Sequence, residues 1–196
     1  MPLPVTDPPP RAPQARELFE RSERERTIAL PPQAELARAA RRLAAALRSG
    51  EVEEVGAACS ALVELLAVFY AVPPPRVEVL QVRPRTLREG WEMQLHGEYD
   101  PESATIRVWM RTAVRRQLVA FPTLCETLLH EFCHHLDCVR WGDTWHTRGF
   151  YERVRRLYTH ALRMRWVDPV WRRGRGGRWW MDLHAMRVAR RGAQGD

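Results

Sequence analysis

The sequence predicts an α+β fold in which a small sheet lies among helices. Three strand-like runs follow one another between residues 77 and 110. A pair of helical patterns precedes these runs, and two further helical patterns follow them. With 196 residues, 45% of them hydrophobic, the chain is long enough for one domain with a sizeable core plus appendages.

The N-terminal segment, residues 1–32, is predicted to be largely disordered. Prolines crowd residues 1–16, which should therefore be extended and poorly ordered. A charged, helix-permissive stretch follows and ends at Pro31-Pro32.

Residues 33–72 are predicted to form a helical pair. The first helix covers residues 33–48, has apolar residues at helical spacing and ends at Ser49-Gly50. The second covers residues 52–72, and the run Pro73-Pro74-Pro75 closes it. The pair is expected to buttress the rest of the fold, with a partner-binding arm and a dimer element as alternatives.

The three strand-like runs are residues 77–82, 91–96 and 105–110, and the turn over residues 97–103 suits a hairpin between the last two. Residues 105–110 are our candidate for a sheet edge to which an extended peptide could add as a further strand. An ordinary half-buried strand explains that run equally well. His96 is expected to be a strand histidine near the site rather than a ligand.

The first helical pattern after the strands contains His130-Glu131-Phe132-Cys133-His134. Thr123 and Glu126 have the spacing of a capping box, and Gly142 supplies a stop. One apolar face gathers the following residues: Cys125, Leu129, Phe132, Leu136 and Val139.

Two histidines four positions apart lie on one face of a helix, about 6 Å apart along its axis, so both can bind one zinc ion. Glu131, directly after the first histidine, can act on the water that such an ion activates. A catalytic zinc ion usually has three protein ligands and one open position.

His146 is the predicted third ligand, because it ends a loop over residues 142–146 just before the next helical pattern. The competing candidates are Glu152, Asp143 and His160. Three neighbours of the motif are expected to be structural rather than ligands: Cys133, His135 and Cys138.

The pattern from His130-Glu131-x-x-His134 to His146-Thr147-Arg148-Gly149-Phe150-Tyr151 resembles that of SprT-like zinc metallopeptidases and the related minigluzincin-type proteases. The similarity extends to Gly97-Glu98-Tyr99-Asp100 and the strand-like run after it, and covers roughly residues 76–165. The resemblance implies a zincin-like core in which His130, His134 and His146 hold one Zn²⁺ ion and Glu131 is the general base. Phe132-Cys133 replaces the family's usual small residue.

The chain is therefore predicted to be a zinc metallopeptidase, a hydrolase acting on protein or peptide substrates, with its core over residues 76–170. One alternative is a zinc-stabilised module that binds nucleic acid or protein without turnover. Another is a zinc hydrolase for non-peptide bonds. Glu131 favours an enzyme, because a structural zinc site is closed by a fourth protein ligand and needs no such carboxylate. Tyr151, Tyr158 and His160 are candidates to stabilise the oxyanion.

All 31 basic residues are arginine, and the positive charge concentrates in the tail, residues 171–196. Arginine, glycine and tryptophan alternate there, a pattern that could bind phosphates and stack on unpaired bases. Nucleic acid is therefore one candidate partner. The alternative is a solvated tail whose tryptophans pack back on the core.

The sequence has no run of 18 apolar residues and no signal-peptide pattern, so we expect no membrane partner and a cytoplasmic location. The four cysteines do not form a disulfide framework, and reduced thiols are expected.

Overall fold

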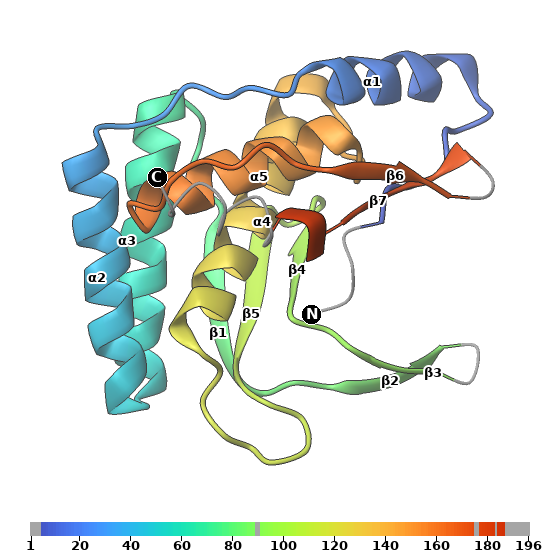
Figure 1. The fold of residues 1–196 in the computed structure, drawn as a ribbon. Coiled ribbons are helices and arrows are strands. Elements are labelled where there is room, and N and C mark those ends of the chain that lie inside the picture. Colours follow the sequence, from blue (N-terminus) through green and yellow to red (C-terminus); the bar gives the residue numbers. More distant parts are fainter. Residues whose placement is uncertain (1–4, 89–90, 175–176, 183, 187–196) are drawn as a thin grey trace.

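A three-stranded sheet and the helices packed on it form the centre of the protein (Figure 1). The computed structural model describes residues 5–88, 91–174, 177–182 and 184–186. The described part is a mixed α+β fold, as the sequence predicts. One hydrophobic cluster joins the sheet to the helices that precede it in the sequence and to those that follow it.

The helical pair consists of α2 (Gln33–Ser49) and α3 (Val52–Tyr70), and its predicted bounds are confirmed to within two residues. Gly50 ends α2 with a φ of 77°, a conformation in which glycine has no steric cost. The helix α3 packs on strand β1 (Arg76–Val82), while α2 contacts both helices that follow the sheet. The pair therefore shares the central core, as expected of a buttress.

The sheet has the strand order β1-β5-β4, where β4 is Gly97–Asp100 and β5 is Thr105–Arg111. Strand β5 runs parallel to β1 and antiparallel to β4. Its side chains Ile106, Val108 and Met110 alternate along the strand, so they share one face of the sheet, where they are fully buried in the hydrophobic core.

Two predictions about the strands are wrong. Residues 91–94 form β3 (Trp91–Gln94), which pairs with β2 (Arg85–Arg88) in a separate hairpin and not with β5. Residues 97–100, predicted as part of a turn, are the strand β4. Residues 105–110 consequently lie at the centre of the sheet, and β4 forms the edge.

The two helices after the sheet are α4 (Phe121–Trp141) and α5 (Arg148–Ala161). The predicted capping box at Thr123 is wrong, because α4 begins two residues earlier and Pro122 lies in its first turn, where the missing N–H costs nothing. Gly142 ends α4 as predicted, with a φ of 80°. On the predicted apolar face, Val139 alone is exposed.

The prediction of disorder over residues 1–32 is wrong for α1 (Pro13–Arg24), which packs against α5 (Figure 1). Phe19 and Ser22 are buried in this contact. The fully buried Arg153 of α5 donates hydrogen bonds to the carbonyl of Glu25 and to the carboxylate of Asp137 in α4, both at 2.6 Å. Sequence periodicity misses this helix because its stability comes from contacts with a segment more than 100 residues away.

The C-terminal part forms a hairpin of β6 (Trp171–Arg173) and β7 (Trp179–Met181), and Val5 pairs with Trp180 beside it. The N-terminal segment thus lies against the C-terminal hairpin, as Figure 1 shows. None of the helices in the described ranges is long and apolar enough to cross a bilayer.

Candidate metal centre

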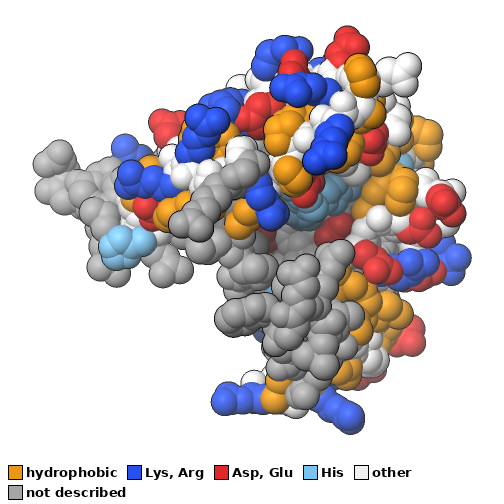
Figure 2. All heavy atoms as spheres, turned by 90° about the vertical axis from the view of Figure 1, so that its right-hand side faces the viewer, with side chains coloured by type: hydrophobic (Ala, Val, Ile, Leu, Met, Phe, Trp, Pro, Cys, Tyr) orange, Lys and Arg blue, Asp and Glu red, His pale blue; other side chains and the backbone are white. Residues whose placement is uncertain are grey.

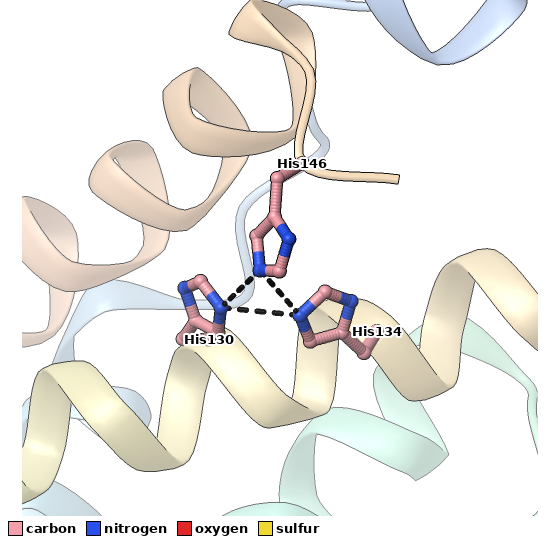
Figure 3. Close-up of side chains that lie close together, drawn as sticks. All are labelled: His130, His134 and His146. Atoms are coloured by element: carbon pink, nitrogen blue, oxygen red, sulfur yellow. Dashed lines mark hydrogen bonds between the residues drawn. The ribbon is translucent and has the colours of Figure 1, made fainter. Parts of the chain in front are cut away.

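Three histidines from two parts of the chain point toward one another (Figure 3). His130 and His134 come from consecutive turns of α4, and His146 comes from the loop that leads into α5. Their Nε2 atoms form an equilateral triangle with sides of 3.1 Å. The three predicted ligands are therefore together, close enough to hold a metal ion.

The triangle has the size that a small metal ion requires. An ion about 2.0 to 2.1 Å from each Nε2 atom, the usual zinc–nitrogen distance, would lie about 1 Å out of the plane of a triangle with 3.1 Å sides. The angles between the bonds would be about 100°, close to tetrahedral. A fourth position would point away from the triangle, where a small molecule could bind.

Burial keeps the two helical imidazoles neutral. It lowers the pKa of His130 to about 3, with a further contribution from His146, and it lowers the pKa of His134 well below its usual value. Neutral rings offer a lone pair to a metal ion at neutral pH, whereas imidazolium does not.

Two aromatic rings of α5 fix the orientation of the ligands. Phe150 stacks on His134, with ring centroids 4.4 Å apart, and is itself fully buried. Tyr151 stacks on His146 at 5.6 Å, and its hydroxyl donates a hydrogen bond to the carbonyl of Val5. Since the second ring nitrogens of His134 and His146 also have partners, neither ring can turn freely.

Those partners are a hydroxyl and a carboxylate. The Nδ1 atom of His134 lies 2.8 Å from Oγ1 of Thr144, and the Nδ1 atom of His146 lies 3.3 Å from Oδ2 of Asp7. Burial alone would raise the pKa of Asp7, but its hydrogen bonds with His146, together with the charges of His146 and Arg178, lower that pKa. The sequence prediction missed both partners, and a residue in a proline-rich segment carries no local signal of such a role.

Glu131 is buried beside the edge strand. The residue is 6% exposed. A Cβ atom on Gly97 of β4 would lie 2.5 Å from Cγ2 of Thr127 and 2.9 Å from Oε1 of Glu131, so glycine lets the strand approach α4 closely here. Burial raises the pKa of Glu131 to about 8, and the nearby charge of Glu98 adds to the effect. The carboxyl group therefore has an unusually high affinity for a proton.

The other candidate ligands have separate partners. Glu152 accepts a hydrogen bond from the indole of Trp171, His160 contacts the carbonyl of Pro31, and Asp143 caps the amide of Thr144. His135 bridges the Tyr99 hydroxyl and the Pro73 carbonyl, as expected for a structural residue. Among the described residues, the metal-binding group comprises three histidines and no cysteine: His130, His134 and His146.

Two lesser predictions concern residues near this group. His96 lies between β3 and β4 instead of inside a strand, and burial lowers its pKa to about 4. The hydroxyl of Tyr151 and the Nε2 atom of His160 both contact backbone carbonyls, of Val5 and Pro31 respectively.

The site is accessible from one face of the molecule. Figure 2 shows histidine atoms near the middle of that face, with acidic and basic side chains beside them. The side chain of His146 is 34% exposed, whereas His134 is buried. A ligand in the fourth position could therefore enter from the side of His146.

The described tryptophans of the tail pack on the rest of the protein. The indole of Trp171 donates to Glu152 at 2.9 Å, and the guanidinium of Arg148 lies 4.2 Å from the centre of the Trp179 ring. These contacts agree with the packing alternative for this part of the tail. Nucleic acid as a partner stays a prediction.

Comparison of the chain with protein-family models, with curated proteins and with solved structures finds no match in any of the three. A proposal about the function therefore rests on the residues and the geometry of the site.

Proposed function

We propose that the chain is a zinc-dependent metallopeptidase with a zincin-like core, in which His130, His134 and His146 bind one zinc ion and Glu131 is the general base. The observation that carries the proposal is the 3.1 Å triangle of Nε2 atoms on a helix that also carries a buried glutamate next to the first ligand. The resemblance of the motifs to SprT-like peptidases supports the same function.

The ligand set favours zinc in a catalytic site. Three imidazole ligands suit zinc, and three protein ligands with one open position are typical of catalytic zinc. A structural site would be closed by a fourth protein ligand. The described residues offer no such ligand within the group, which favours an enzyme over a zinc-stabilised binding module.

Zinc bound there would polarise the scissile carbonyl and lower the pKa of a water molecule. The Glu131 carboxylate would accept a proton from that water and deliver it to the leaving amine nitrogen. Burial raises the pKa of Glu131, and the charge of a bound ion would oppose this effect and favour the carboxylate form that a general base needs. Phe150 and the other stacked rings would hold the ligands in place during the reaction.

The position of β4 supports a peptide as the substrate. This strand pairs with β5 on one side and, among the described residues, with no strand on the other. Gly97 brings its backbone against Glu131. An extended peptide that added to β4 through main-chain hydrogen bonds would therefore run close to the general base.

The proposal is tested by measuring cleavage of casein by the zinc-loaded protein and by its Glu131→Gln variant. The variant should bind zinc normally but hydrolyse casein about 10²- to 10⁴-fold more slowly, because the general base is lost. A chelator should abolish cleavage by the parent protein, and added zinc should restore it.

Glu126→Gln is the matched control, because it makes the same change on the same helix at a residue that belongs to neither the ligands nor the base. This control should cleave at the parent rate. Full activity in Glu131→Gln would contradict the assignment of the base, and zinc binding without any cleavage by the parent would favour the binding module.

A further inference from the structure

The N-terminal residues Val5, Thr6 and Asp7 are bound between the C-terminal hairpin and the loop that carries His146. The amide of Thr6 donates to the carbonyl of Trp179, and the amide of Trp179 donates to the Thr6 hydroxyl, both at 2.8 Å. The next amide, of Asp7, donates to the carbonyl of His146, also at 2.8 Å. The segment is thus part of the wall of the metal centre.

The Asp7 carboxylate holds His146 at two points. Its Oδ2 atom accepts a hydrogen bond from the backbone amide of His146 at 2.8 Å and lies 3.3 Å from the Nδ1 atom of the same residue. A carboxylate at Nδ1 favours the tautomer with the proton on that nitrogen, so the lone pair is on Nε2. Nε2 is the atom that faces His130 and His134.

His146 needs such support more than the other two ligands do. His130 and His134 are fixed by the backbone of α4, whereas His146 lies in a loop outside any helix. The second partner of His134 is the neutral hydroxyl of Thr144. The carboxylate therefore acts on the ligand whose position is least determined by secondary structure.

The helix α1 holds the residues that directly follow His146. The hydroxyls of Ser22 and Thr147 are 2.9 Å apart, and the Glu23 carboxylate accepts a hydrogen bond from the amide of Arg148 at 2.8 Å. His146 and the two residues after it are thus bound by the N-terminal segment. Such contacts place Asp7 where its carboxylate can orient the ligand.

We infer that Asp7 is a positioning residue for the metal ligand His146, so that the N-terminal segment completes the metal centre. This inference rests on the proposed metal site and holds whether or not the site hydrolyses peptides. A carboxylate partner of a ligating histidine makes the ring a stronger donor and fixes its orientation, and losing one typically weakens metal binding 10- to 100-fold.

The test compares zinc affinity in the full-length parent, Asp7→Ala and Asp7→Asn by competition with a chromophoric chelator. Asp7→Ala should bind zinc about 10- to 100-fold more weakly, and Asp7→Asn, which keeps an acceptor but loses the charge, should fall between Asp7→Ala and the parent. The visible absorption spectrum of the cobalt(II)-substituted protein should also shift in both variants, since it reports the donor strength of the ligands.

Thr6→Val is the control, because it removes the hydrogen bond to Trp179 in the same segment but leaves the carboxylate in place. Its zinc affinity and cobalt spectrum should match those of the parent. Circular dichroism of the metal-free proteins shows whether each variant is folded; a folded Asp7→Ala with weakened zinc binding supports the positioning role.

Parent-like zinc affinity and cobalt spectra in both Asp7 variants would overturn the inference, and so would an equal loss of affinity in Thr6→Val. A parent protein that binds zinc but cleaves nothing would contradict only the proposed peptidase activity, since the comparison of affinities would still decide the role of Asp7. A parent that binds no zinc would overturn both.

Discussion

Glu131 is a carboxyl group buried beside another acidic residue, Glu98. Burial and the charge of Glu98 both favour the protonated form, and together they raise its pKa to about 8 in the metal-free protein. In the unfolded chain the carboxyl group returns to its ordinary pKa of about 4.5. The stability of the metal-free protein must therefore depend on pH at this residue.

The Glu131→Gln variant should become more stable relative to the metal-free parent as the pH rises from 5 to 8. Between about pH 4.5 and 8 the folded parent keeps a proton on Glu131 that the unfolded chain has already lost. The contribution of this proton to the stability of the parent is therefore complete below pH 4.5 and is lost as the pH rises through about 8. The difference in unfolding free energy should grow by up to about 1.4 kcal/mol per pH unit. Urea unfolding of both proteins at several pH values measures it, and a difference independent of pH would contradict the burial of an unpaired carboxyl group.

The ligands show which residues sequence reasoning can find. His130 and His134 follow from the periodicity of one helix, and His146 follows from its place just before the next one. Asp7 contacts His146 across 139 residues of sequence, and no pattern near either residue indicates the contact. Ligands that share a helix are predictable, whereas their partners from distant segments depend on the tertiary fold.

The contact between α1 and α5 is the tightest approach that a glycine makes to another element in the described structure. A Cβ atom on Gly149 would lie 2.0 Å from the carbonyl oxygen of Ser22 and 2.9 Å from that of Glu25. Both carbonyls belong to the end of α1, which also binds Arg153. The absence of a side chain at Gly149 therefore allows the end of α1 to lie directly against α5.

Gly149→Ala should destabilise the protein by about 2 kcal/mol, because overpacking this contact costs more than the gain of at most about 1 kcal/mol in helix propensity. Gly56→Ala in α3 makes the same change where a Cβ atom would meet nothing within 4 Å, and it should stabilise the protein. Chemical denaturation of both variants provides the comparison. Equal stabilisation in the two variants would mean that α1 does not pack on α5 as described.

The elements differ in how well the sequence predicts them. Helix α2 has a long apolar pattern that ends at a glycine, so its bounds follow closely from the sequence, and Thr147 marks the start of α5. Strand β4 has four residues, two of which, Gly97 and Asp100, are uncommon in strands. Pairing with β5 and packing on α4 outweigh these local preferences, which is why the run was predicted as a turn.

At the scale of the whole molecule, residues 5–7 and the C-terminal hairpin of β6 and β7 meet beside the metal centre. Asp7 contacts His146, Arg178 donates to the carbonyl of Thr6, and Val5 pairs with Trp180. The sequence does not predict these contacts, because the composition of one segment carries no information about which distant segment it will pack against. The centre of the fold, with its sheet and the paired helices α4 and α5, presents the histidines, and the N-terminal segment supports the one that lies in a loop.

The central claim, a three-histidine zinc site with one open position, is tested most directly by zinc X-ray absorption spectroscopy of the zinc-loaded protein. The account predicts one zinc ion per chain with three imidazole nitrogens and one non-protein oxygen, all about 2.0 to 2.1 Å from the metal. A sulfur ligand at about 2.3 Å, or a fourth imidazole, would show a closed structural site and would contradict the proposed catalytic centre.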